Sequence, residues 1–219
     1  MIVTIDGPAG AGKSSISRKV AFTLGFGFLD TGAMYRCVTL RAMLHGVSFS
    51  DPSELHHVAA DADITLRGDV VILDGRDVSA EIRKPEVTAN IRYIADEPKI
   101  RGILNQQQRK IAEGDNMVTE GRDQGTDVFP DADCKIYLTA SPETRARRRK
   151  QQLQDLGQES PYADVLQRLI RRDEQDKSRP VGALRIAKDA IVIDSDELTH
   201  QEVLERIVQI VKEHQSSKV

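Results

Sequence analysis

The chain has 219 residues and is poor in the residue types that several common protein classes need. It has no tryptophan, only 4% aromatic residues and two cysteines. Few aromatic rings leave little for stacking nucleic-acid bases, and two cysteines are too few for a disulfide scaffold. The formal net charge is -3. This balance argues against electrostatic binding of DNA, RNA or an anionic membrane.

Long apolar segments are missing as well. No uncharged apolar run approaches the roughly 18 residues needed to span a bilayer, and the first residues lack the basic start of a secretory signal. We therefore expect a cytoplasmic protein. Its 39% hydrophobic and 30% charged residues suit a single α/β domain, residues 1–219, with a charged surface.

The cysteines and histidines give no sign of a metal site or a catalytic triad. Cys37 and Cys134 lie far apart in the sequence, and we interpret both as buried, reduced thiols. The five histidines have no partners at the spacing of metal ligands or triad members. We expect His45, His56 and His57 to lie at the surface in helical or loop segments.

Short apolar segments alternate with segments of helical spacing along most of the chain. The candidate strands are 1–5, 26–30, 116–119, 134–138 and 190–193. The candidate helices are 14–24, 35–44, 85–108 with a break near Pro98, 142–154, 163–177 and one at the carboxyl-terminal end. This alternation predicts an α/β fold with a mainly parallel central sheet covered by helices on both faces.

Residues 50–85 interrupt the alternation. Asp51-Pro52 can start a short helix, and residues 62–66 have the composition of a strand. Residues 70–73 followed by Asp74-Gly75 predict a hairpin. We interpret this region as a small β-containing insertion.

A phosphate-binding loop follows the first strand. It matches the pattern G-x-x-x-x-G-K-[ST] at every fixed position: Gly7, Pro8, Ala9, Gly10, Ala11, Gly12, Lys13 and Ser14. Glycines let backbone N–H groups approach a phosphate, and the following helix adds partial positive charge at its start. Lys13 can follow the phosphoryl group that moves, and the Ser14 hydroxyl can ligate Mg²⁺. The chain is predicted to be a P-loop nucleoside-triphosphate-binding protein with a three-layer α/β/α fold.

The residues after the loop favour a kinase over other P-loop classes. No Asn-Lys-x-Asp segment for reading guanine is present. Residues 117–120 form an apolar strand that ends in Glu120-Gly121-Arg122-Asp123, at the sheet edge where open α/β sheets bind ligands. Arginines follow at 145, 147, 148, 149, 171, 172 and 179. Guanidinium groups stay charged when desolvated and form bidentate hydrogen bonds with phosphate. The basic segment near residue 145 therefore suits a lid that closes over a phosphorylated ligand.

The chain resembles the bacterial cytidylate kinases, which phosphorylate CMP and dCMP with ATP. Order and spacing agree from about residue 2 to residue 195. The matching segments are 5–14, 29–36, 77–79, 81–83, 120–126, 129–132 and 172–179. The resemblance implies a nucleoside monophosphate kinase with an acceptor-binding insertion at about 36–97 and a helical lid at about 145–165. It also implies a monomer that binds ATP, Mg²⁺ and CMP or dCMP.

The resemblance assigns expected roles residue by residue. The ATP phosphates would be bound by residues 7–14 with Ser15, Arg145 and Arg149, and Ser14 would hold the metal. CMP would be bound by Thr31, Tyr35, Arg36, Arg101, Arg122, Asp123, Arg172, Asp176 and Arg179. Within this group Asp176 would face the sugar, and Asp123 would select cytosine by accepting a hydrogen bond from its exocyclic amine. The expected catalytic residues are Lys13, Arg122 and Arg149.

The chain departs from the family pattern at three places. Thr31 stands where the family often has serine, which keeps the hydroxyl. Arg92 stands where the family tends to have a serine near the base, so we assign that contact to no residue. Asp74-Gly75-Arg76-Asp77 echoes residues 120–123, and we interpret it as a hairpin turn because Asp-Gly suits such a turn.

Two alternatives remain open from the residues alone. Another P-loop kinase of the same architecture would act on UMP, AMP or shikimate, since discrimination in a pocket rests on few atoms. A nucleotide-binding switch that hydrolyses ATP slowly would not need this concentration of arginines. ATP hydrolysis without dependence on any acceptor would favour the switch.

Overall fold

The computed structural model describes residues 1–155 and 157–216, and in them the chain divides into two units. The first joins Met1–Phe28 to the chain from Asp115 onward, and the second is Leu29–Gly114. The second unit includes the insertion expected at about 36–97 and extends past it at both ends. Each unit has its own sheet and its own helices.

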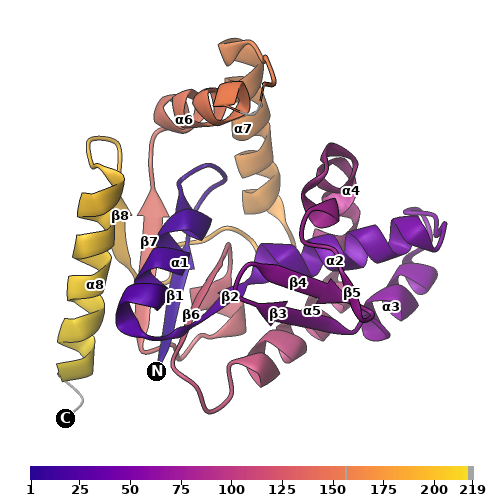
Figure 1. Cartoon of the computed structure of the whole chain (residues 1–219), viewed down its shortest axis with the longest axis horizontal. Coiled ribbons are helices and arrows are strands. Elements are labelled where there is room, and N and C mark those ends of the chain that lie inside the picture. The colour runs from indigo at the N-terminus through magenta and orange to yellow at the C-terminus, as the bar shows by residue number, and fades with distance from the viewer. Residues whose placement is uncertain (156, 217–219) are drawn as a thin grey trace. The chain divides into compact units, whose positions relative to one another are not determined.

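The first unit is built on a parallel β-sheet (Figure 1). Among the described residues its strand order is β2-β6-β1-β7-β8. The strands are β1 Ile2–Asp6, β2 Gly27–Asp30, β6 Met117–Gly121, β7 Cys134–Thr139 and β8 Ile191–Asp194. The pairs β1–β6, β1–β7 and β7–β8 are parallel, which confirms the predicted sheet. Because β6 lies directly beside β1, with Asp6 opposite Gly121, the segments that leave these two strands start side by side.

The helices of the first unit that the structure describes are α1 Lys13–Leu24, α6 Pro142–Asp155, α7 Tyr162–Ser178 and α8 His200–Ser216. Of these, α1 and α8 pack against the sheet. Helices α1 and α8 pack together over a core whose members include Val3, Ile5, Ile16, Ile136 and Ile207, each at most 2% exposed. These residues recur at strand and helix periods, which is why the sequence pattern located the elements. No helix in residues 1–155 and 157–216 is long and apolar enough to cross a membrane.

Helices α6 and α7 pack against each other around a separate small cluster formed by Ala9, Ala146, Val165 and Leu169. The expected lid, at about 145–165, corresponds to most of α6, the connecting loop and the start of α7. Leu156, which falls within the range expected for the lid, lies outside the described residues.

The second unit is mostly helical and carries a small antiparallel sheet. Its helices are α2 Thr31–Leu44, α3 Pro52–Ala60, the 3₁₀ turn η1 Glu81–Arg83, α4 Pro85–Ala95 and α5 Pro98–Ile111. Its strands are β3 Ile64–Arg67, β4 Val70–Leu73 and β5 Arg76–Asp77, in the order β3-β4-β5. This confirms the predicted β-containing insertion and the helix break near Pro98.

The echo of the 120–123 segment is a turn, as predicted. Leu73 pairs with Arg76 across an antiparallel ladder, so Asp74 and Gly75 form a two-residue loop. Both have positive φ, 50° and 78°, which is the backbone that Asp-Gly adopts in tight hairpins. The Asp74 carboxylate accepts a hydrogen bond from Arg41 at 2.7 Å.

Helix α2 begins at Thr31, four residues before the expected start. The Asp30 carboxylate accepts a hydrogen bond from the Ala33 amide at 3.0 Å and caps the helix. A side-chain cap satisfies an amide at the helix start, so Thr31 and Gly32 are helical although their composition is typical of a loop. The end of the helix expected over 14–24 is confirmed by the left-handed φ of 68° at Gly25, the residue that caps it.

Both cysteines are buried free thiols, as the sequence indicated. Burial raises the pKa of Cys37 to about 12 and that of Cys134 to about 12. Neither sulfur is therefore an activated nucleophile.

Candidate active site

The loop between β1 and α1 has the backbone that phosphate binding requires. Gly7, Gly10 and Gly12 have φ values of 151°, 79° and 89°, a region that side chains with a Cβ rarely adopt. A Cβ on Gly7 would also lie 2.0 Å from the Leu138 carbonyl oxygen. No other residue fits there, because the carbonyl oxygen belongs to the backbone of β7 and cannot move aside as a flexible side chain could.

Lys13 is the first residue of α1 and is buried. Its Nζ donates to the Pro8 carbonyl at 2.8 Å, so the amine curls back over the loop. Burial, and then the nearby Arg122 guanidinium, lower the pKa of Lys13 to about 7. A phosphate group in the loop would add negative charge beside this buried amine and favour its protonated form.

Ser14 and Glu120 bring two oxygen ligands together from distant parts of the chain. The Ser14 hydroxyl donates to Glu120 Oε1 at 2.7 Å, and Glu120 lies near the end of β6 with 5% exposure. Hydroxyl, carboxylate and phosphate oxygens are the ligands that Mg²⁺ prefers. These residues therefore fit the expected metal. Ser15 is exposed, and its hydroxyl donates to the Gly12 carbonyl at 2.9 Å.

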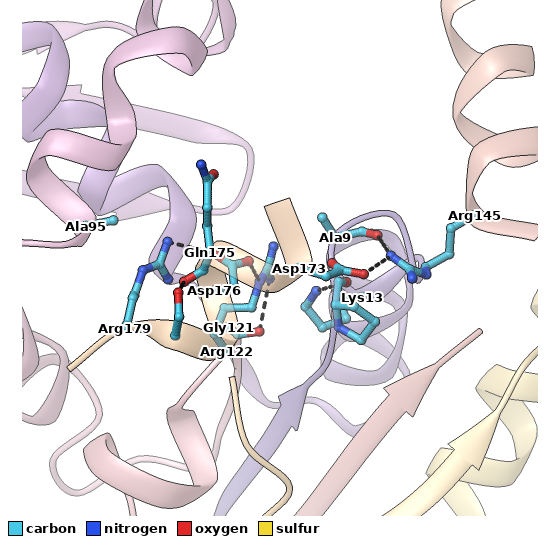
Figure 2. A network of polar contacts seen from close by, with 12 residues as sticks. Ala9, Lys13, Ala95, Gly121, Arg122, Arg145, Asp173, Gln175, Asp176 and Arg179 are labelled. Atoms are coloured by element: carbon cyan, nitrogen blue, oxygen red, sulfur yellow. Dashed lines mark hydrogen bonds and ion pairs between the residues drawn. The ribbon is translucent and has the colours of Figure 1, made fainter. Parts of the chain in front are cut away.

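Arg122, Asp176 and Arg179 form an ion-paired cluster in the first unit (Figure 2). Arg122 Nε lies 2.8 Å from Asp176 Oδ2, and an Arg179 nitrogen lies 2.6 Å from Asp176 Oδ1. Burial opposes ionisation of Asp176, but Arg122 and Arg179 hold the pKa of its carboxyl below the usual value. Both arginines are thus fixed at the end of β6, where phosphate oxygens of a ligand could exchange for the carboxylate.

Asp123 and Arg172 belong to the same region of the first unit. Asp123 is 3% exposed and directly follows Arg122. The Arg172 guanidinium, on α7, lies near enough to favour the ionised form of Asp176 and the neutral form of Lys13. The structure therefore groups these expected acceptor residues with the phosphate loop.

Arg145 and Arg149 lie on the same helix but differ in surroundings. The buried Arg145 donates to the Ala9 carbonyl of the phosphate loop at 2.9 Å and pairs with Asp173 at 2.7 Å (Figure 2). Arg149 is exposed and donates to Gln152 of its own helix at 2.6 Å. Arg145 thus contacts the loop, whereas the role expected for Arg149 stays a prediction.

The remaining expected acceptor residues lie in the second unit. Thr31 and Tyr35 are buried on α2. The buried Arg101 guanidinium lies over the Tyr35 ring, 5.2 Å from its centroid, and donates to the Ala95 carbonyl at 2.9 Å. Arg36 donates to the Thr88 hydroxyl at 2.7 Å and to the Ile82 carbonyl at 3.1 Å. Tyr35 and Arg101 are therefore brought together.

Sequence reasoning did not assign roles to three buried carboxylates beside these groups, namely Asp6, Glu120 and Asp173. Each contacts a residue or loop far away in sequence, so no local pattern identifies its partner. For Asp6 a signal was present: an acidic residue ends an otherwise apolar strand directly before Gly7. A buried charge at such a position needs a partner.

Asp6 provides a test of the electrostatics of the unliganded chain. Burial raises the pKa of Asp6 from 3.8 to about 7, although the hydrogen bonds that it accepts from two backbone amides favour the charged form. A raised pKa in the folded chain contributes stability that is complete below 3.8 and is lost as the pH rises through about 7. The melting temperature of the wild type should therefore fall relative to that of Asp6→Asn as the pH rises from about 4 to 7. Above about pH 7 the difference should stay constant. A difference in melting temperature that stays constant from about pH 4 to 7 would contradict the raised pKa.

A parallel sheet whose first strand runs into a glycine loop, a buried lysine and a helix defines a P-loop protein. The arginine cluster at the neighbouring strand end is typical of phosphotransferases that bind two phosphorylated ligands. The cytidylate kinase family model matches residues 3–213. The chain belongs to the cytidylate kinase family.

Individual relatives agree with this assignment. The chain is 54% identical to the cytidylate kinase of Rhodopirellula baltica over 97% of this chain and 93% of the relative. It is 46% identical to that of Caldanaerobacter subterraneus subsp. tengcongensis over 99% and 97%. A crystal structure of an uncharacterized protein from Eubacterium ventriosum has a TM-score of 0.53 at 12% identity, covering 97% of this chain and 98% of that one. This last likeness concerns the fold alone.

Proposed function

We propose that the chain is a nucleoside monophosphate kinase that transfers the γ-phosphoryl group of ATP to CMP or dCMP, giving CDP or dCDP and ADP. The observation that carries the proposal is the position of Arg122. It lies at the end of β6, directly beside the strand that leads into the phosphate loop, and is ion-paired with Asp176. Family membership and the near full-length relatives named cytidylate kinase support the choice of acceptor.

The donor side would be formed by the phosphate loop. Backbone amides of residues 7–14 and Ser15 would hold the ATP phosphates, and Lys13 would leave the Pro8 carbonyl to follow the γ-phosphoryl group. Ser14 would hold Mg²⁺, which when bound neutralises phosphate charge and orients the phosphates. Arg145 contacts the loop already through Ala9. Arg149 would join it on binding of the nucleotide, a prediction that needs the side chain to leave Gln152.

The acceptor site would use the residues that the resemblance assigns to CMP. Arg122, Arg172 and Arg179 would neutralise the α-phosphate of CMP, Asp176 would bind the sugar and Asp123 the cytosine amine. Thr31, Tyr35, Arg36 and Arg101 would complete the set. An acceptor phosphate oxygen attacks the γ-phosphorus as the bond to the β-phosphate oxygen breaks, and ADP leaves. The attacking oxygen is already anionic, so the residues need only position and stabilise charge.

We further propose that the enzyme works as a monomer in the cytoplasm. The two free, buried thiols are in keeping with a reducing compartment.

The proposed function is tested by offering acceptors one at a time. ADP formation from ATP and Mg²⁺ should be strong with CMP and dCMP and weak with UMP, AMP, GMP and shikimate. Chelation of the metal should remove it, and added Mg²⁺ should restore it. Preference for another acceptor would reassign the acceptor site, and ADP formation without any acceptor would support a slow ATPase instead.

A further inference from the structure

Asp6 links the two segments that leave β1 and β6. Its carboxylate is buried and accepts hydrogen bonds from two successive amides, Gln124 at 2.9 Å and Gly125 at 2.7 Å. These residues begin η2, the π-helical turn Gln124–Val128 that directly follows Asp123. The residue that precedes the phosphate loop thus holds the start of the turn that follows the cytosine-selecting position.

The turn has little freedom to move away from this contact. The Gln124 side chain accepts from the Thr119 hydroxyl at 2.7 Å. A Cβ on Gly125 would lie 2.8 Å from Thr4 Oγ1 and 3.4 Å from Asp6 Oδ2, so only glycine brings the backbone this close to β1. The turn is therefore held against β1 by an acceptor that matches both of its leading amides.

Asp123 is the residue on which this arrangement acts. Its carbonyl accepts from the amides of Asp127 at 2.9 Å and Val128 at 3.1 Å, which closes the turn. Its φ of -139° and ψ of 18° belong to neither strand nor helix. Such a backbone conformation is kept by surrounding contacts rather than by its own preference. Two of the nearest contacts are the hydrogen bonds that the Gln124 and Gly125 amides donate to Asp6.

We propose that Asp6 is a positioning residue for the acceptor nucleotide, which holds the backbone after Asp123 so that Asp123 and Arg122 face the acceptor. This inference rests on the proposed function, because it assigns Asp123 and Arg122 to the acceptor. A different role is also open to test: the Asp6 charge favours the protonated form of Lys13, and an effect by that route would fall on ATP. The two routes predict opposite patterns in the Michaelis constants.

The variant Asp6→Asn tests the proposal. Asparagine keeps the size of the side chain and one acceptor oxygen, but its NH₂ group meets the second amide donor. The KM for CMP should rise roughly tenfold, with the KM for ATP within about twofold of the wild type. Asp131→Asn, an exposed aspartate just beyond the same turn, is the matched control and should leave both constants unchanged.

Gly125→Ala approaches the same contact from the other side. The added Cβ should push the turn away from Thr4 and Asp6 and reproduce the selective rise in the KM for CMP. In the double variant the two effects should not add, because both remove one contact. Three results would overturn the proposal. They are a larger rise in the KM for ATP than in the KM for CMP in Asp6→Asn, an equal rise in both, and a lowered melting temperature with both Michaelis constants unchanged.

Amide hydrogen exchange tests the contact without any activity. The amides of Gln124 and Gly125 should exchange at least about tenfold faster in Asp6→Asn than in the wild type, with the amides of β7 unchanged. If the wild type fails to phosphorylate CMP, the proposed function fails while the exchange rates still report on the contact. Unchanged exchange at both amides would exclude Asp6 as the anchor of the turn.

Discussion

Replacing Lys13 with alanine is expected to lower the rate of phosphoryl transfer from ATP to CMP by roughly 10²–10³-fold. The Lys13 amine lies at the start of α1, within hydrogen-bond distance of the Pro8 carbonyl. It is the group that would follow the γ-phosphoryl group during transfer. Single-turnover measurements at saturating ATP and CMP separate this loss from weaker binding.

The same variant should stay folded. Burial lowers the pKa of Lys13 to about 7, so the unliganded chain gains little from keeping a charged amine there. Its melting temperature should equal or exceed that of the wild type. Lys19→Ala, an exposed lysine on the same helix, is the control and should retain full activity. A Lys13→Ala protein with a near wild-type rate would remove the loop from the mechanism.

Replacing Asp123 with alanine is expected to raise the KM for CMP by roughly tenfold to a hundredfold, while the KM for ATP changes little. The buried carboxylate is the group expected to accept a hydrogen bond from the cytosine amine, which uracil lacks. Discrimination between CMP and UMP should therefore fall together with CMP affinity. Competition assays with both acceptors measure the two effects in one experiment.

The interpretation of Asp123→Ala depends on where the loss falls. Asp131→Ala removes an exposed carboxylate a short distance along the chain and should leave both constants unchanged. Equal losses for ATP and CMP would make Asp123 a structural residue or place it on the donor side. Loss of CMP affinity with unchanged discrimination against UMP would assign the selection of cytosine to another residue.

Several local features were predictable because a few neighbouring residues determine them. The glycine pattern of residues 7–14 demands a backbone that few other sequences can adopt, and the positive φ of Gly10 and Gly12 follows from it. Asp74-Gly75 specified a tight hairpin, and Asp51 before Pro52 specified a helix start. In each case the physical cause lies within about four residues.

Other local features escaped prediction because their cause is a contact rather than a preference. The early start of α2 depends on the Asp30 side chain bonding to Ala33. The composition of η2 does not predict a π-helix. The turn forms where the Asp6 carboxylate accepts hydrogen bonds from two of its amides. Such positions are determined by groups that the chain brings in from elsewhere.

The sequence alone therefore determined the class of the protein, the phosphate loop and the residue types that are expected to meet the phosphates. Only the tertiary structure decided which of them meet: Ser14 with Glu120, Arg122 with Asp176, and Arg145 with Asp173 and Ala9. These partners come together because β6 inserts beside β1, and because α6 and α7 pack as a pair next to the loop. Strand order and helix packing follow from burial of apolar surface over the whole chain, which no short segment encodes.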